Sequence, residues 1–363
     1  MIATMWVWLA IVVAACGGSS VPPPDGSVEE PLLPQVPTAG GPVIAHPQLV
    51  SITWASDFVL APDLEAFDRW VLQSSFWAPL VEYGIGAGSV VATWHVPTDP
   101  PAMMTELDVQ NFLQTAITNA SVPAPTPNTI YSMYFPPNVT ITGSEGTSCV
   151  SYGGFHDAMT LPGGQRVYFV VNARCPTSTN LLDEMTNIAS HEYGEASTDP
   201  DPVMPAYRLN APDSLAPWLS GEIGDLCEDN DSVVDGYVIN PLYINSAAAA
   251  NQRPCVPAPP GPVFAALPNP DLLNLAIGMS GQTDVHIATV GASSGPLTLS
   301  VYPNDTTGAL TVSATAPTVH PGDHVSVTIM LSSGMIGYGQ NITLDLRDSA
   351  GYVSKRTLVV IPQ

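Results

Sequence analysis

Two patterns of apolar and polar residues divide this chain. In the first, found between residues 48 and 258, apolar residues recur every three or four positions, which is the spacing of an amphipathic helix. It predicts helices over 64–84, over 106–118 and over 176–196, the first of them broken near Pro79 because proline cannot donate the helical hydrogen bond.

Short runs rich in β-branched and aromatic residues separate these helices. They predict strands over 89–96 and 129–137, and a stronger strand over 163–175 that could be the second arm of a hairpin turning at Gly163 and Gly164. Helices and strands therefore alternate, which predicts a mixed α+β domain over residues 48–258.

The second pattern follows a proline-rich stretch at 253–262. Residues 262–363 contain short strands in which polar and apolar residues alternate, with turn signals such as HPGDH and DSAGY between them. Six or seven strands over this length predict an all-β, immunoglobulin-like sandwich. This segment has neither Cys nor Trp, so it is not an antibody-type domain.

The chain begins with an apolar run, MIATMWVWLAIVVAA, which is too short to span a bilayer permanently and predicts a signal peptide over residues 1–15. The small residues before Cys16 resemble the lipobox of bacterial lipoproteins, in which that cysteine is lipidated. An ordinary signal peptide is the alternative, and no Lys or Arg precedes the run. Residues 16–47, rich in Pro, Gly and Ser, are predicted to form a tether.

Four cysteines remain after Cys16, and an even number in an exported chain predicts two disulfides. Three pairings are possible. Cys149–Cys175 and Cys227–Cys255 are favoured because each closes a local loop. A metal site built from all four thiolates is disfavoured, since no Cys-x-x-Cys spacing occurs.

The balance of charges narrows the classes of partner. Lys and Arg together number 8 against 32 Asp and Glu, so the formal net charge is -24. A surface of this sign repels nucleic-acid phosphates, which excludes a nucleic-acid-binding function. It also disfavours adsorption to anionic lipid.

The segment NIASHEYGEASTDPDP, at the end of the third predicted helix, carries the candidate chemistry. His191 and Glu195 lie four residues apart and therefore leave the same helix face, with Glu192 beside them. Zinc peptidases with His-Glu-x-x-His use two histidines as ligands and the Glu as general base. Here Glu195 would replace the second histidine, because a carboxylate can also bind zinc.

A third ligand must come from another part of the chain. One candidate is His156, before the strong strand, and the other is the downstream pair Glu222 and Asp225, which resembles the third-ligand segment of thermolysin-like zincins. The plainer interpretation is a solvated polar helix face. Asp199 and Asp201 could likewise be calcium-type ligands or simply turn residues.

Five motifs in order carry a family resemblance: FWAPLVEYGIGAGSV, NTIYSMYFPPNVTI, CVSYGGFHDAM, ASHEYGEASTDPDP and GEIGDLC. Over residues 50–255 they resemble secreted bacterial HExxE proteins of the zincin-like metallopeptidase type, which are distantly similar to the exordium, or phosphate-induced, proteins of plants. The resemblance implies functional roles for His156, His191, Glu192, Glu195 and Asp225. It departs at Tyr193-Gly194, where the family has Leu-Ala, and glycine weakens a helix by about 1 kcal/mol relative to alanine.

This resemblance implies a zincin-like domain over 48–258 that binds one divalent metal, zinc, and hydrolyses peptide bonds with metal-activated water and Glu192 as base. The chain would be a lipid-anchored protein of the bacterial cell envelope, on the outer membrane or cell surface, or a secreted one. The alternative is a non-catalytic lipoprotein that binds cell-wall or other carbohydrate.

The lipid anchor gives the first testable prediction. Cys16→Ser should move the protein from the membrane fraction to the soluble fraction, because the acylated residue is lost. Fractionation followed by immunoblotting measures this. A wild-type protein that is already soluble and begins beyond Cys16 would contradict the anchor.

Overall fold

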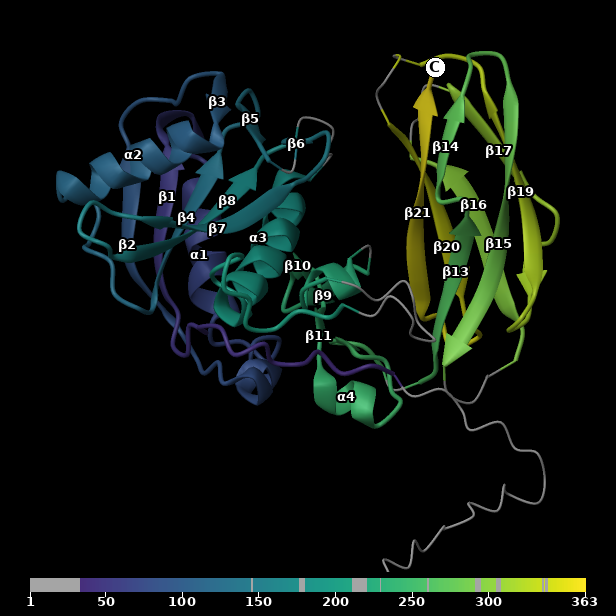
Figure 1. Cartoon of the computed structure of the whole chain (residues 1–363), viewed down its shortest axis with the longest axis horizontal. Coiled ribbons are helices and arrows are strands. Elements are labelled where there is room, and N and C mark those ends of the chain that lie inside the picture. Colours follow the sequence, from purple (N-terminus) through teal and green to yellow (C-terminus); the bar gives the residue numbers. More distant parts are fainter. Residues whose placement is uncertain are drawn as a thin grey trace, which may run out of the picture. The chain divides into compact units, whose positions relative to one another are not determined.

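The structure is a computed structural model, and it describes residues 33–144, 146–175, 180–210, 221–228, 230–259, 261–290, 295–304, 308–334, 336 and 339–363. The predicted signal peptide, Cys16 and the first half of the predicted tether lie outside these residues. Strand residues outnumber helical residues in the described part of the chain (Figure 1).

A five-stranded mixed sheet forms the framework of the first part of the chain. Its four neighbouring parallel strands are followed at one edge by an antiparallel strand, so the order is β2 (Ser89–Val96), β1 (Gln48–Trp54), β4 (Thr129–Phe135), β8 (Arg166–Ala173) and β7 (Gly154–Thr160). All seven residues of β4 are buried, as expected for a parallel strand with both faces covered.

Helices cover both faces of this sheet (Figure 1). Ile130 and Tyr134 of β4 pack in one core with α1 (Ala61–Val71) and α3 (Leu181–Thr198). Tyr131 and Met133 alternate with them and pack in a second core with α2 (Glu106–Thr118). The strand period of two thus separates two apolar cores, one on each side of the sheet.

Shorter elements complete the first part. They are three 3₁₀ turns, Ala55–Asp57, Ala78–Tyr83 and Asp225–Cys227; the short helix α4 (Asn245–Ala249); and the short strands β3 (Met103–Thr105), β5 (Thr140–Gly143), β6 (Gly146–Thr147), β9 (Ser232–Val234), β10 (Tyr237–Ile239), β11 (Leu242–Tyr243) and β12 (Cys255–Val256).

Some of the predicted helices and strands match the observed ones, and one predicted helix differs. Helix α2 has the predicted bounds, because Thr105 and Asp108 close a capping box at its start. The first predicted helix instead ends at Val71 and resumes as a 3₁₀ turn, Ala78–Tyr83, that contains Pro79. The hairpin at Gly163 and Gly164 is present, with β7 as its first arm.

The structure corrects the prediction of a tether over residues 16–47. Within its described portion, Leu33, Val36 and Ile44 are buried and belong to the same core as α1 and α3. The prolines between them keep this segment out of helices, but they leave these apolar side chains free to pack. The composition of this segment therefore did not reveal that its apolar side chains are buried.

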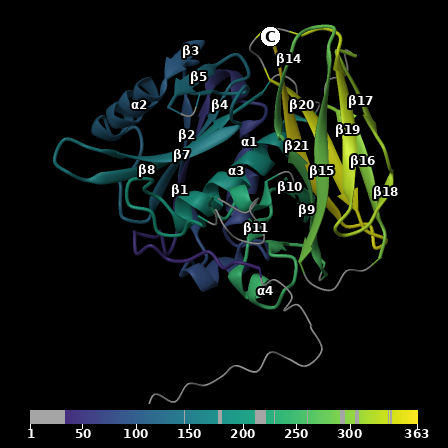
Figure 2. The ribbon, with the colours of Figure 1, turned by 45° about the vertical axis from the view of Figure 1, so that its right-hand side comes forward.

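The C-terminal part is a β-sandwich, which confirms the predicted sandwich at the level of two packed sheets (Figure 2). One sheet has the order β13 (Val263–Asn269), β15 (Ser280–Val290), β19 (His324–Leu331) and β17 (Leu310–Ala314). The other has the order β14 (Leu272–Leu275), β21 (Val353–Pro362), β20 (Gln340–Arg347), β16 (Leu297–Pro303) and β18 (Thr318–Val319). A single apolar core contains residues from both sheets.

Both favoured disulfides are present. Cys149 pairs with Cys175, and Cys227 pairs with Cys255. Such bonds are compatible with an extracellular location, since they persist in oxidising compartments. None of the helices in the described part of the chain has the length and hydropathy that crossing a membrane requires.

The closed core of the sandwich predicts that this segment folds alone. A fragment of residues 262–363 should unfold cooperatively on heating and give a β-type circular dichroism spectrum, because its apolar core draws on its own strands. A spectrum of unstructured chain would show that the sandwich depends on the preceding domain.

Candidate metal centre

Three segments that are distant in the sequence form the candidate centre: strand β7, helix α3 and the turn at Asp225–Cys227. The pairing of β7 with β8 fixes which side of the sheet each side chain faces. His156 lies opposite Val170, which packs in the core that contains α3. Its neighbour Phe155 lies opposite Val171 and packs on the other face. The register therefore turns His156 toward the helix.

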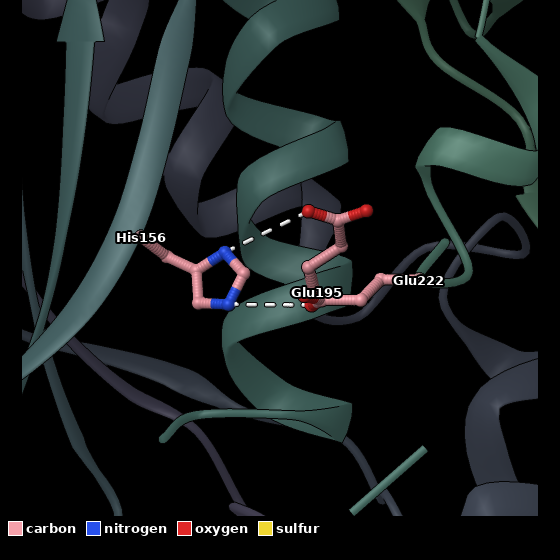
Figure 3. Close-up of side chains that lie close together, drawn as sticks. All are labelled: His156, Glu195 and Glu222. Carbon is pink, nitrogen blue, oxygen red and sulfur yellow. Dashed lines mark ion pairs between the residues drawn. The ribbon is translucent and has the colours of Figure 1, made fainter. Parts of the chain in front are cut away.

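His156 contacts the centre with both ring nitrogens, and its side chain is 7% exposed. Nδ1 lies 3.4 Å from Glu192 Oε2 and 3.6 Å from Glu195 Oε2. Nε2 lies 3.3 Å from Glu222 Oε2 and 3.0 Å from the backbone carbonyl oxygen of Asp199. Figure 3 shows Glu195 beside one nitrogen of this imidazole ring and Glu222 beside the other.

The second histidine lies one helical turn before Glu195. His191 Nε2 is 3.1 Å from Glu195 Oε2 and 3.7 Å from Asp225 Oδ1. The spacing of four residues on α3 produces the first contact, as the sequence predicted. The 3₁₀ turn supplies the second.

Backbone amides fix the orientation of Glu195. Gly224 N and Asp225 N donate hydrogen bonds to Glu195 Oε1, at 3.1 and 3.0 Å. The other oxygen, Oε2, is therefore the one that faces the two histidines. A carboxylate held in this way by charge-assisted bonds has little freedom to rotate.

Two glycines leave room for these side chains. A Cβ atom at Gly224 would lie 2.8 Å from Glu195 Oε1 and 3.0 Å from the His191 ring. A Cβ atom at Gly154 would lie 2.9 Å from Glu192 Oε1. Glycine is also favoured at position 194 within α3, because a Cβ atom there would lie 2.7 Å from the buried side chain of Leu242.

Glu222 is buried, with 5% exposure, and its two oxygens have different environments. Arg208 Nη1 binds Oε1 at 3.0 Å. Oε2 has no hydrogen bond among the described residues and makes an ion pair with His156 Nε2 at 3.3 Å. A buried carboxylate oxygen needs such a cation or a donor nearby, because burying it alone is costly.

The protonation equilibria reflect this crowding of acidic groups. Burial, followed by repulsion from Glu195, raises the pKa of Glu222 to about 8. Burial would lower the pKa of His156, but Glu192, Glu222 and Glu195 oppose it and raise that pKa to about 10. Burial opposes ionisation of Glu195, yet the neighbouring His191 lowers its pKa to about 2. The centre thus strongly favours positive charge in its middle.

Two groups of side chains in the described part of the chain could hold a metal ion. One comprises His156, Glu195 and Glu222, the other His191, Glu195 and Asp225, and in each the ligand atoms lie within 4.8 Å of one another. Imidazole nitrogen and carboxylate oxygen are zinc ligands. Glu222 Oε2, which is buried and has no hydrogen bond among the described residues, supports this fit, so the residues suit the metal that the motif implied.

A cavity of about 350 Å³ opens onto the centre. Its lining includes both histidines, Glu192, Arg208, Glu106 and Asp157. Glu192 lies in this lining but belongs to neither candidate ligand group. Water and a small part of a substrate therefore have access to its carboxylate.

The structure brings together every residue that the sequence singled out for the site, namely His156, His191, Glu192, Glu195, Glu222 and Asp225. The carbonyl oxygen of Asp199 reaches His156, but the side chains of the two acidic turn residues have other hydrogen-bond and ion-pair partners. Asp199 Oδ1 accepts a hydrogen bond from Ala206 N, and Asp201 pairs with Arg166. These contacts are those of turn and ion-pair residues, and neither aspartate belongs to a ligand group.

Sequence reasoning missed Arg208, the Asp199 carbonyl and Gly224. Arg208 follows the motif in a stretch without periodicity, so no pattern linked it to Glu222. The carbonyl contact exists only because the chain turns after α3. Gly224 could have been noticed as the small residue between Glu222 and Asp225, where two ligands approach one backbone.

A buried polar network holds α3 from its other side. The Tyr193 hydroxyl lies 2.7 Å from Ser132 Oγ on β4 and 2.7 Å from Asp68 Oδ1 on α1. The Tyr134 hydroxyl donates to the same Asp68 oxygen at 2.6 Å. Tyr193 lies between Glu192 and Glu195 in the sequence, so the network fixes the segment of helix that carries both. Sequence analysis did not predict this role.

Comparisons with known proteins assign no family. No family model matches the chain, and no curated protein matches it. Partial likenesses exist to domains 4 and 5 of the S-layer protein SbsC (15% identity, TM-score 0.23, 28% of this chain and 53% of that one) and to the BIgI domain of the beta protein from S. agalactiae (15%, 0.20, 28% and 97%).

A third likeness is to the secreted serine protease VesC from Vibrio cholerae (9% identity, TM-score 0.21, 28% of this chain and 23% of that one). The chain thus spans about half of the SbsC structure and less of the protease. Likenesses with TM-scores this low establish neither the fold nor the function of this chain.

Asp68 yields a prediction about pH. Burial raises its pKa from the ordinary value of 3.8 to about 6, against the opposing hydrogen bonds of Ser51, Tyr134 and Tyr193. Below pH 3.8 the carboxyl group is protonated in both folded and unfolded states. Between the two pKa values only the unfolded state ionises, so the wild type should lose up to about 3 kcal/mol of stability as pH rises through this window.

Urea unfolding of wild type and Asp68→Asn at about pH 4 and about pH 7 measures this loss, because Asn cannot ionise. The difference in unfolding free energy between the two proteins should shift in favour of Asp68→Asn at the higher pH. Asp63→Asn, an exposed position on the same helix, is the matched control and should show no such shift. A pH-independent difference for Asp68→Asn would contradict the raised pKa.

Proposed function

We propose that this chain is a zinc-dependent peptidase of the zincin-like class, with its catalytic centre at the His-Glu-x-x-Glu segment of α3. The observation that carries this proposal is the convergence of two histidines and three carboxylates, from three separate segments, in one largely buried group beside a cavity.

The electrostatics support a bound cation. Glu192, Glu195 and Glu222 are each 5% exposed or less. Among the described residues, Arg208 is the permanent cation that pairs with this group. Burying several carboxylates around one arginine is unfavourable unless further positive charge offsets their repulsion. The raised pKa values of His156 and His191 mean that protonated imidazoles supply this charge in the metal-free centre. A bound divalent ion would supply it in their place, and mixed nitrogen and oxygen ligands suit zinc.

When bound, zinc would act as a Lewis acid that activates water and polarises a substrate carbonyl group. The protein's own residues would supply the rest of the chemistry. Glu192 is the general base in this proposal, because its carboxylate lines the cavity and is not needed as a ligand. It would take a proton from the attacking water at its carboxylate oxygen and later give it to the departing amine.

The surrounding residues would position these groups. His156 Nδ1 lies 3.4 Å from Glu192 Oε2, so the imidazole limits where the base can point. The amides of Gly224 and Asp225 hold Glu195 in its ligand orientation. Tyr193, on the opposite side of α3, ties the helix to β4 and α1. Burial of the centre also limits access of bulk water to the reacting groups.

The proposed setting is the cell envelope. The two disulfides fit an exported protein. The signal peptide and lipidation at Cys16 remain predictions from the sequence, and the protein would act at the cell surface or after secretion. The alternative remains a non-catalytic envelope protein that binds cell-wall or other carbohydrate, which would have no need of bound zinc.

Zinc binding and catalysis can be tested separately. Glu195 belongs to both candidate ligand groups, so Glu195→Gln should remove most of the zinc-dependent gain in melting temperature. For the wild type this gain should correspond to about 3 kcal/mol at a zinc concentration 100-fold above Kd. Glu192→Gln should keep the gain but lower hydrolysis of an unfolded protein substrate by about 100-fold or more.

Glu106→Gln is the matched control, since Glu106 lines the same cavity but belongs to neither ligand group. It should bind zinc as the wild type does, because no ligand is lost. If wild type purified without chelators contains no zinc and added zinc leaves its melting temperature unchanged, the peptidase proposal fails. The wall-binding alternative would then be preferred.

A further inference from the structure

We propose that the centre binds two divalent ions bridged by Glu195, with His156 and Glu222 completing one site and His191 and Asp225 the other. This inference rests on the proposed function, since it concerns the same centre, but it changes the number of ions from one to two. The observation behind it is that two ligand groups overlap in a single residue, Glu195.

The bridging position of Glu195 follows from its hydrogen bonds. Its Oε1 is occupied by two backbone amides, whereas Oε2 lies between the histidines, 3.1 Å from His191 Nε2 and 3.6 Å from His156 Nδ1. One carboxylate oxygen thus faces two imidazoles that come from different elements. Metal-bridging carboxylates need such access from two sides.

A single ion does not use the whole group. Zinc bonds to nitrogen and oxygen are about 2.0–2.2 Å long, so two ligands of one ion lie within about 4.4 Å of each other. The two histidines fall into different ligand groups. An ion bound by His191, Glu195 and Asp225 would therefore leave His156 and Glu222 as a second, complete pair of ligands beside the shared carboxylate.

Glu222 argues against leaving the second site empty. It is 5% exposed, and Arg208 satisfies only Oε1. Oε2 has no hydrogen bond in the described part of the chain and makes only an ion pair there, with His156 Nε2 at 3.3 Å (Figure 3). His156 Nε2 also lies 3.0 Å from the Asp199 carbonyl oxygen, and donating to it would orient the ring and leave Nδ1 as the ligand atom. An oriented histidine beside a buried carboxylate oxygen without a hydrogen bond is the kind of arrangement that holds a metal ion.

The charge of the centre admits both ions. Glu192, Glu195, Glu222 and Asp225 carry four negative charges when ionised, and Arg208 carries one positive charge. With neutral imidazoles, one divalent ion leaves negative charge buried. Two divalent ions leave the centre with a net charge of one positive unit. This charge suits a site that must attract water and a carbonyl oxygen. Paired ions about 3.5–4 Å apart occur in aminopeptidases and other hydrolases.

The test is metal stoichiometry in the full chain. The protein is stripped with chelator, reconstituted with zinc, desalted and analysed by plasma mass spectrometry alongside its concentration. Wild type should hold about two zinc ions per chain, and His156→Ala and His191→Ala should each hold about one. Glu222→Gln, nearly isosteric, should also hold one and replaces His156→Ala if that variant does not fold. Glu106→Gln, the control, should hold two.

Cobalt gives an independent readout. Two Co²⁺ ions that share a carboxylate are magnetically coupled, so the electron paramagnetic resonance signal per cobalt should be weaker in wild type than in either histidine variant. Equal signals per cobalt in all three proteins would overturn the bridge.

The outcomes separate this inference from the proposed function. One zinc in wild type overturns the second site but leaves the peptidase proposal intact, whether His156→Ala keeps that ion or both histidine variants lose it. No zinc in wild type overturns both.

Discussion

The buried carboxylate of Glu195 is the group on which the candidate centre depends. It is 4% exposed, two backbone amides hold one of its oxygens, and both histidines face the other. Each contact comes from a different part of the fold: α3 itself, the turn at Asp225–Cys227, and the edge strand β7. A buried charge of this kind is tolerated only where its partners are already in place, so the fold and the site constrain each other.

Helix α3 meets this constraint because it is packed on several sides. Its Tyr193 hydroxyl joins a polar network with Ser132 and Asp68, and Gly194 permits close contact with Leu242. The sequence showed glycine at this position as a weakness in the helix. In the structure the intrinsic cost of about 1 kcal/mol accompanies a close approach that a larger residue would obstruct. Local helix propensity gives way to tertiary packing here.

Structural features that depend on residues close together in the sequence could be predicted from it. The capping box of α2, the spacing of His191 and Glu195 on one helix face, and the short loops closed by the disulfides were all visible in the sequence. Strand β1 and the burial of residues such as Ile44 were not visible in the sequence, because they depend on partners far along the chain. Both proposed sources of a third ligand, His156 and the pair Glu222 and Asp225, reach the centre. Choosing between them needed the register of β7 and the path of the turn, which no spacing encodes.

The central claim is that zinc binds at this centre through histidine and carboxylate side chains. X-ray absorption spectroscopy at the zinc edge of the purified full chain tests it most directly. The account predicts nitrogen and oxygen ligands at about 2.0–2.2 Å, with the outer-shell scattering of imidazole and no sulfur at about 2.3 Å. Glu195→Gln should weaken this signal. Absence of bound zinc, or a spectrum with no imidazole contribution, would contradict the account.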